Sequence, residues 1–361
     1  MEIKIKALTP IWTGGVEGKP DRLHTTSIIG SMRWWYEVVV RGLGGYACDP
    51  SSEKRCELSG KEKTREERLA KLCPACYLFG CGGWKRRFRL EVQSNTSVPF
   101  QLATLESKNK FNHWWLSQIF EDSRGTNLPF GEISLSLNGD DDVIDQVKAL
   151  LSIMVNIGGI GAKTQYGYGQ FDWDDKIELK NAINTIRQFL SGNIFKSGSN
   201  KDKWYSLTNF WYYKLSITSD NGLVNKFKNA NLIGNGNMPS DYLPVSFDIR
   251  YKMPSSGDGT GLRSAYYSFC RHSMSKEDAK QKTRSLFGTL ENDKIGSRIF
   301  VSHLFRRRNI DNNHHLKVWG FTDDSVGKVV GDELKNIFGL DKPPSIVTGK
   351  ELINYSRGEV Q

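Results

Sequence analysis

Alternating apolar and polar residues open the chain. Residues 2–7 place Ile3 and Ile5 between charged neighbours. A period of two predicts a half-buried β-strand, because successive side chains of a strand point to opposite faces. A helical pattern follows at 27–42 and stops at a group of glycines, so we expect a long loop and then a helix.

The pattern then continues through the first half of the chain. Strand patterns occur at 84–92 and 131–139, a second helical pattern at 143–157, and a short strand pattern at 168–174. The predicted order is therefore strand, helix, strand, strand, helix, strand. This order is typical of a ferredoxin-like α+β domain, in which two helices cover one face of an antiparallel sheet.

The polar stretch between residues 191 and 205 marks the predicted boundary between two tandem ferredoxin-like domains, 1–191 and 205–361. A glycine-rich turn near 257–261 precedes a helical pattern, and another helix is predicted at 326–338. Strands are predicted at 211–217, 243–253, 297–305 and 314–321, and within the last of these His314 and His315 are interpreted as surface residues.

A loose internal repeat supports two copies of one unit. Gly30 and Arg33 precede a Leu-Phe-Gly triplet at 78–80, just as Gly261 and Arg263 precede the same triplet at 286–288. The first copy has the longer spacing because it contains a polar segment at 46–76, which we interpret as an insert.

The first predicted helix carries both apolar anchors and candidate binding residues. Trp34 and Trp35 are expected to anchor the core. Gly30 and Arg33 lie near the helix start, where backbone N–H groups and a guanidinium can both face a phosphate.

The segment 159–169, GIGAKTQYGYG, brackets five residues with two Gly-x-Gly pairs. A bare backbone allows close approach to a phosphate or a sugar, and its N–H groups can form an anion nest. The segment therefore predicts contact with a phosphodiester chain, although a structural turn remains the alternative. The candidate contacts are Gly159, Gly161, Lys163, Thr164, Gln165, Tyr166, Gly167, Tyr168 and Gly169. A nucleotide-hydrolysing phosphate loop does not fit, because Ala162 separates Gly161 from Lys163 and the preceding element is helical.

The charge balance favours a polyanionic partner. Lys and Arg number 50 and Asp and Glu 40, which gives a net charge of +10. Each phosphate that Lys or Arg neutralises releases counterions. Two clusters concentrate this charge and are predicted to contact nucleic acid. They are Lys85, Arg86, Arg87 and Arg89, and Arg306, Arg307 and Arg308.

The N-terminal residues do not form a secretion signal, and no apolar run approaches the length of a membrane span. A cytoplasmic protein without a membrane partner is therefore expected. Of the six cysteines, five lie between Cys48 and Cys81, and Cys73 and Cys76 form a Cys-x2-Cys knuckle. With Cys48 and Cys56 the knuckle predicts a structural zinc site, with Cys81 as a substitute for either of these two. Unligated thiols and disulfides are the alternatives.

The segment GIGAKTQYGYG resembles the Gly-h-Gly-x5-Gly-h-Gly signature of the RAMP superfamily, the repeat-associated proteins of CRISPR systems. LTPIWTGG, SIIGSMRWWYEVVVRGLGG and CPACYLFGCGGW are similar to segments of the first subunit of the type III-B (Cmr) effector complex. The resemblance covers much of residues 8–84 and also 153–171.

This resemblance implies a non-catalytic, RNA-binding subunit with two ferredoxin-like domains, which acts in antiviral defence. Its partners would be guide RNA toward the 3′ end, target RNA and other RAMP subunits. Two alternatives remain: a RAMP endoribonuclease that processes guide RNA precursors, with His24 as its candidate, and a protein scaffold without direct RNA contact. No catalytic residue is predicted, and apart from zinc no cofactor is expected.

Overall fold

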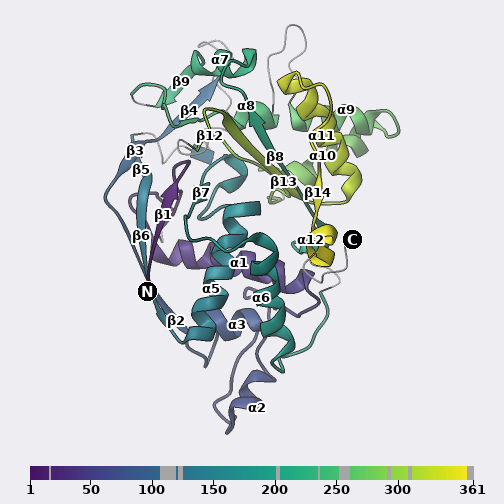
Figure 1. Cartoon of the computed structure of the whole chain (residues 1–361). Helices are drawn as coiled ribbons and strands as arrows, with labels where there is room; N and C mark the ends of the chain where they lie inside the picture. The colour runs from purple at the N-terminus through teal and green to yellow at the C-terminus, as the bar shows by residue number, and fades with distance from the viewer. Residues whose placement is uncertain are drawn as a thin grey trace.

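The computed structural model describes residues 1–15, 18–105, 119–120, 125–200, 204–234, 236–251, 261–290, 294–307 and 311–355. Two antiparallel sheets with flanking helices dominate it (Figure 1). The prediction of an α+β protein with antiparallel sheets is confirmed.

The first sheet has the strand order β2-β6-β1-β7. Its strands are β1 (Glu2–Ala7), β2 (Phe88–Ser94), β6 (Gly131–Gly139) and β7 (Phe171–Asp172). Ile3 pairs with Leu135 in β6, and both are buried. The alternation predicted for residues 2–7 is confirmed, because the apolar residues of β1 all face the core.

Helices α1 (Thr25–Gly42) and α5 (Asp141–Ile157) contribute the other side of this core. Both follow strands of the sheet, in the predicted order. Trp35 is 3% exposed, and Trp34 is packed against the same cluster. The two tryptophans therefore anchor the core, as their position on an apolar helix face predicts.

The second sheet repeats this order of elements. It runs β10-β12-β13-β8-β14, and β11 also pairs with β13. Helices α9 (Leu262–Arg271) and α11 (Asp324–Phe338) pack on one of its faces. Its strands are β8 (Phe210–Ile217), β10 (Tyr242–Leu243), β11 (Ile299–Val301), β12 (Leu304–Arg306), β13 (His314–Phe321) and β14 (Val347–Thr348).

The opposite face of the second sheet packs on the first half. Phe210 of β8 and Phe321 of β13 belong to the same core cluster as α1. The ring of Phe321 lies 5.4 Å from that of Trp34, and the ring of Phe210 lies 6.1 Å from that of Trp35. This part of the sheet is therefore closed by protein and does not offer aromatic rings to a ligand.

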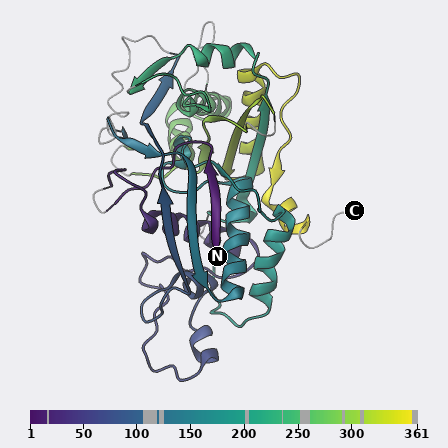
Figure 2. The same cartoon turned by 60° about the vertical axis from the view of Figure 1, so that its left-hand side comes forward.

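A small sheet also joins the two halves. It pairs β4 (Gln101–Thr104) with β9 (Asn231–Gly234), and a second small sheet pairs β3 (Ser97–Pro99) with β5 (Asn127–Pro129). The remaining helices are α2 (Arg65–Leu69), α3 (Pro74–Phe79), α6 (Leu179–Ser191), α7 (Gly222–Lys228), α8 (Ser246–Tyr251), α10 (Lys276–Phe287) and α12 (Gly349–Tyr355). Figure 2 shows the insert with α2 projecting at one end of the molecule.

The Leu-Phe-Gly repeat has the same geometry in both halves. Gly80 ends α3 with φ 87° and ψ 160°, and Gly288 ends α10 with φ 83° and ψ 164°. A positive φ favours glycine at both positions. Just beyond each helix, the amide of an arginine donates to the leucine carbonyl of the triplet, at 3.1 Å in the first half and 2.8 Å in the second.

Three predictions about strands and one about burial were wrong. The strand expected at 297–305 is two strands, β11 and β12, with Ser302 and His303 between them. The segment 243–253 was expected to be a strand, but β10 ends at Leu243 and α8 follows, because Pro244 cannot continue a ladder. The strand expected from residue 84 begins only at Phe88. His314 was interpreted as a surface residue, yet it is 3% exposed.

None of the helices in the described part of the chain is long and apolar enough to span a membrane.

Candidate functional site: the glycine loop and the cysteine cluster

The loop 159–169 connects α5 to β7 and lies where the two halves meet. On one side it contacts the N-terminal loop, since the amide of Ala162 donates to the carbonyl of Trp12 at 2.8 Å. On the other side the amide of His303, between β11 and β12, donates to the carbonyl of Gly167 at 3.2 Å. The loop is therefore held by both halves of the chain.

Close packing explains two of its glycines. Gly169 has φ +79°, and a Cβ there would lie 2.0 Å from the carbonyl oxygen of Ile160. Gly167 has φ +104°, and a Cβ there would lie 2.3 Å from Nδ1 of His303. Gly159, Gly167 and Gly169 are all buried. In this conformation their bare backbone faces protein atoms.

The accessible part of the loop runs from Gly161 to Tyr166. Ala162 is exposed and the other five residues are half-buried. Lys163 takes the left-handed conformation, with φ 54°. Its ammonium group lies 4.5 Å from the ring centroid of Trp12 and 5.0 Å from that of Phe120, a cation–π arrangement.

A short 3₁₀ helix, η3 (Thr164–Tyr166), forms the middle of the loop. The amides of Thr164 and Gln165 begin this helix, so no residue within it can accept their hydrogen bonds. Tyr166 is tied to the second half, because its carbonyl accepts a hydrogen bond from the hydroxyl of Ser246. The amides of Thr164 and Gln165 therefore belong to the half-buried part of the loop.

Tyr168 and His303 form the buried side of the loop. Tyr168 is 1% exposed and lies 5.3 Å from Trp12, ring to ring. His303 is fully buried, and burial lowers its pKa to about 3 because the charged imidazolium is disfavoured away from water. The amide of Ser246 donates to its Nδ1 at 3.3 Å. Both rings serve packing between the halves.

A basic cluster surrounds Asp172, just after the loop. The ammonium group of Lys176 lies 3.0 Å from the Asp172 carboxylate, and Arg307 Nε lies 3.8 Å from it. Lys317 pairs with Lys214 across β13 and β8 and donates to a main-chain carbonyl of α5. Burial lowers the pKa of Lys317 well below its ordinary value. Lys176 and Arg307 thus pair with Asp172 at the junction, next to Lys214 and the buried Lys317.

The two predicted basic clusters are placed differently. Lys85, Arg86 and Arg89 are exposed, whereas Arg87 is half-buried and paired with Asp140. In the other cluster, Arg306 and Arg307 are half-buried, and Arg307 reaches the Asp172 cluster. Arg308 lies outside the described residues.

The remaining candidates near α1 also differ from one another. Gly30 is exposed, and a Cβ there would meet nothing within 4 Å. Arg33 is engaged within the protein, with its guanidinium bonded to Glu37, Gly80 and Cys76. His24 caps the helix start, and its Nε2 lies 2.6 Å from Oδ1 of Asp21.

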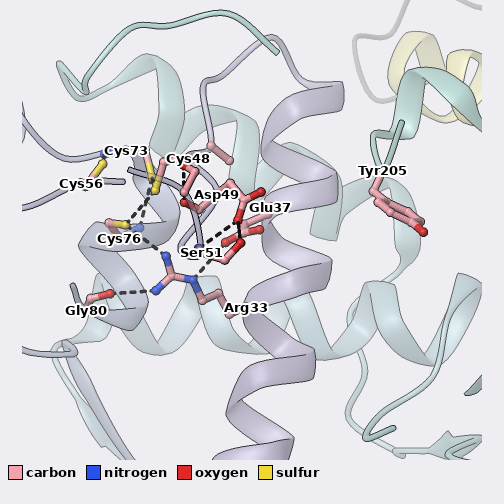
Figure 3. A network of polar contacts seen from close by, with 12 residues as sticks. Arg33, Glu37, Cys48, Asp49, Ser51, Cys56, Cys73, Cys76, Gly80 and Tyr205 are labelled. Carbon is pink, nitrogen blue, oxygen red and sulfur yellow. Dashed lines mark hydrogen bonds and ion pairs between the residues drawn. The ribbon is translucent and has the colours of Figure 1, made fainter. Parts of the chain in front are cut away.

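The structure brings four cysteines together between α1 and the insert (Figure 3). The sulfur atoms of Cys48, Cys56, Cys73 and Cys76 all lie within 4.8 Å of one another, and all four residues are buried. Cys81 is half-buried and is not part of this cluster. All six cysteines of the chain are free. The disulfides left open by the sequence are therefore not formed.

The spacing suits a tetrahedral metal ion. Zinc–sulfur bonds of about 2.3 Å place the sulfurs of a tetrahedral site about 3.8 Å apart. Here Cys48 Sγ lies 3.4 Å from Cys76 Sγ and 3.8 Å from Cys73 Sγ. Hydrogen bonds from the thiols of Cys56, Cys73 and Cys76 lower the pKa of Cys48 well below its ordinary value. The four cysteines can hold a metal ion.

The main chain and a solvent-side hollow support the same interpretation. The amide of Cys76 donates to Cys73 Sγ at 3.4 Å, and the amide of Cys73 donates to Cys56 Sγ at 3.3 Å. Such bonds stabilise thiolates. A cavity of about 270 Å³ borders Cys48, Cys56 and Cys76.

Sequence reasoning did not identify the partners that the second half supplies. His303, Ser246 and the Lys214–Lys317 pair come from segments more than 40 residues from the loop along the chain. Lys214 and Lys317 interrupt apolar strands. This interruption was the sequence signal for charged groups at the junction. Their neighbours depend on strand register, which no local pattern reveals.

Comparison with known families agrees with this architecture. Residues 4–172, which contain the first sheet, α1, α5 and the glycine loop, match the model of the RAMP superfamily. The similarity to the RAMP superfamily therefore covers the part of the chain that forms the first sheet and the glycine loop.

Among solved structures, the chain is similar to Cmr1 from Pyrococcus furiosus in its apo form. The identity is 13%, the TM-score is 0.43, and the match covers 89% of this chain and 87% of that chain. It is also similar to a chain of the type III-B Cmr-beta complex bound to cognate target RNA, in two cryo-EM structures. One of these also contains AMPPnP and was determined in the presence of ssDNA.

For these two structures the identities are 13% and 14%, the TM-scores are 0.44 and 0.43, and each match covers 93% of this chain and 99% of the other. No curated protein matches the chain.

Proposed function

We propose that this protein is a non-catalytic, RNA-binding subunit of a type III-B CRISPR effector complex. Both halves act as ferredoxin-like RAMP domains. In this role the protein holds guide RNA toward its 3′ end, supports capture of target RNA and contacts other RAMP subunits. The observation that carries the proposal is the RAMP match over residues 4–172, which includes the signature loop at 159–169.

The accessible part of the loop supplies the first RNA contact. The amides of Thr164 and Gln165 have no acceptor within η3, and Lys163 adds a positive charge next to them. Phosphate oxygens accept hydrogen bonds from such amides and are attracted by the ammonium group. Gly159, Gly167 and Gly169 contribute by allowing the tight packing that fixes this surface.

The basic segment before and within β2 supplies a second contact. Lys85, Arg86 and Arg89 are exposed, and Arg87 is held by Asp140. Charges in such a segment bind a phosphate backbone without reading its sequence. A subunit that holds one strand of any sequence needs contacts of this kind.

The basic cluster at the junction extends this surface toward the second half. Lys176, Lys214 and Arg307 all interact with the carboxylate of Asp172. Burial disfavours ionisation of Asp172, but the hydrogen bond from Lys176 lowers its pKa overall. The cluster therefore keeps a net positive charge after Asp172 has ionised.

We propose further that the cysteine cluster binds structural zinc. The insert has little apolar surface of its own, and a metal ion with four thiolates would fix it against α1. The distances between the sulfurs and the burial of all four residues support zinc over unligated thiols.

Ultraviolet crosslinking of the purified chain to a guide-like RNA, followed by mass spectrometry of the linked peptides, tests the RNA role. The expected crosslinks fall in the peptides that contain 161–166 and 85–89. A protein scaffold without RNA contact would give no crosslinks, and this outcome would overturn the proposal.

A further inference from the structure

Each of the three guanidinium nitrogens of Arg33 donates a hydrogen bond within the protein (Figure 3). Its Nη2 donates to Cys76 Sγ at 3.1 Å, its Nη1 donates to the carbonyl of Gly80 at 2.8 Å, and its Nε donates to Oε1 of Glu37 at 3.0 Å. The three acceptors come from α1, from α3 and from the glycine that ends α3. The planar fork of an arginine fits such a set, and a lysine cannot reproduce it.

The charges around Arg33 explain why a cation lies next to the cysteine cluster. Four thiolates around a divalent ion carry a net charge of −2, and a buried negative charge requires a nearby cation. Arg33 donates to a sulfur atom of the cluster, and its side chain is 18% exposed. Glu37 lies between Arg33 and Arg41, with Oε2 accepting from Arg41 Nη2 at 3.1 Å. The two arginines and one glutamate therefore leave one positive charge to balance the site.

We propose that Arg33 is a positioning residue for the metal-bound Cys76 thiolate. It donates a hydrogen bond to the sulfur, partly neutralises the site and connects the site to α1. This inference rests on the zinc site proposed above. It replaces the phosphate contact that the sequence suggested for Arg33, because each donor atom of its guanidinium already has an acceptor.

Removing a residue that hydrogen-bonds to a metal ligand usually lowers the metal affinity by about 10- to 100-fold. We therefore expect Arg33→Met to weaken metal binding by about 10-fold. The hydrogen bond from Arg33 also lowers the energy of the lone pairs on Cys76 Sγ. Its loss should move the thiolate-to-cobalt charge-transfer band of the Co²⁺-loaded protein to longer wavelength.

Arg41→Met is the matched control, since Arg41 lies on the same helix and bonds to the same glutamate. Its other contacts are the carbonyls of Ala47 and Tyr205. This variant measures the cost of disturbing α1 without removing a bond to sulfur. It should keep the band position, because the bond from Arg33 to Cys76 Sγ remains.

The experiment titrates the full-length chain with Co²⁺ against a competing chelator and records the charge-transfer band. A wild-type protein without this band would overturn both the metal site and the role of Arg33. A wild-type protein with the band, and Arg33→Met with unchanged affinity and band position, would overturn only the role of Arg33. If Arg33→Met does not fold, Arg33→Gln decides by Co²⁺ affinity, because it also removes the charge.

RNA binding distinguishes the proposed metal-site role of Arg33 from the phosphate contact that the sequence suggested. With metal bound, Arg33→Met is expected to bind guide-like RNA as the wild type does and with the same salt dependence. Weakened RNA binding at unchanged Co²⁺ affinity would instead assign Arg33 to the phosphate backbone.

Discussion

The rings of Tyr168 and His303 lie 4.9 Å apart in an edge-to-face arrangement. Tyr168 belongs to the glycine loop of the first half, and His303 lies between β11 and β12 of the second. Through this contact the loop with the RAMP signature becomes part of the junction between the two halves. Its conformation therefore depends on both halves.

The first prediction concerns Gly167. Gly167→Ala places a Cβ 2.3 Å from His303 Nδ1 at a φ of +104°, so the loop or the histidine must move. We expect a loss of stability of at least about 1–3 kcal/mol, measured by denaturant unfolding.

Gly30→Ala is its control, because Gly30 lies within a helix and has open space around it. This variant should be neutral or more stable by up to about 1 kcal/mol. Equal stability of Gly167→Ala and wild type would show that the loop does not pack against His303 in solution.

The second prediction concerns pH. Burial lowers the pKa of His303 from 6.5 to about 3, so the folded protein keeps this imidazole neutral while the unfolded chain protonates. Stability from this residue is complete above pH 6.5 and is lost as the pH falls toward 3, with a slope of up to about 1.4 kcal/mol per pH unit.

His303→Asn keeps an acceptor for the Ser246 amide and removes the titration. Between pH 6.5 and 4 the free energy of unfolding of this variant should therefore fall less steeply than that of the wild type. Parallel pH profiles would contradict the buried, neutral state of His303.

The third prediction tests the RNA surface. Lys163→Ala is expected to weaken binding of guide-like RNA and to reduce the slope of log K against log salt by about 0.7, the value for one phosphate contact on a single strand. Lys342→Ala removes an exposed charge outside the proposed surface and serves as the control. Fluorescence anisotropy at several salt concentrations measures both quantities.

A second set of variants addresses the other proposed contact. Replacing Lys85, Arg86, Arg87 and Arg89 by neutral residues should weaken binding further and flatten its salt dependence. If these variants and Lys163→Ala all bind RNA as tightly as the wild type at moderate salt, the proposed surface is misplaced.

The fourth prediction concerns catalysis. The purified chain is expected to leave labelled repeat RNA intact, because a metal-independent ribonuclease needs both a base and an acid near the 2′-hydroxyl. The partner of His24 in the structure is the exposed carboxylate of Asp21. Sequence-specific cutting that disappears in His24→Ala would favour the endoribonuclease alternative, and gel analysis of the products would reveal it.

The fifth prediction concerns metal removal. A chelator should lower the Tm by about 2–4 °C for each kcal/mol that the metal contributes. Cys76→Ser should lower the Tm and remove most of the response to chelator, whereas Cys81→Ser should keep it, because Cys81 lies outside the cluster. Metal analysis of protein purified without chelator measures the zinc content directly. Absence of zinc together with reactive thiols would contradict the site.

The sequence alone determined the order of elements in the first half. Ile3 and Ile5 alternate with charges, and α5 shows a helical period, so burial of apolar surface selects one structure for each segment. The cysteine group was also predictable, since a Cys-x2-Cys knuckle combines with other cysteines of a polar insert.

Tertiary structure decided the features that depend on distant neighbours. Pro244 ended β10 where the pattern alone favoured a strand, and His314 is buried because its strand packs inside the sheet. Arg33 has the sequence position of a phosphate contact, but folding brings Cys76 within hydrogen-bond distance of it. Local periodicity records which face of a segment is buried, whereas the identity of the partner depends on packing between segments that are far apart in the chain.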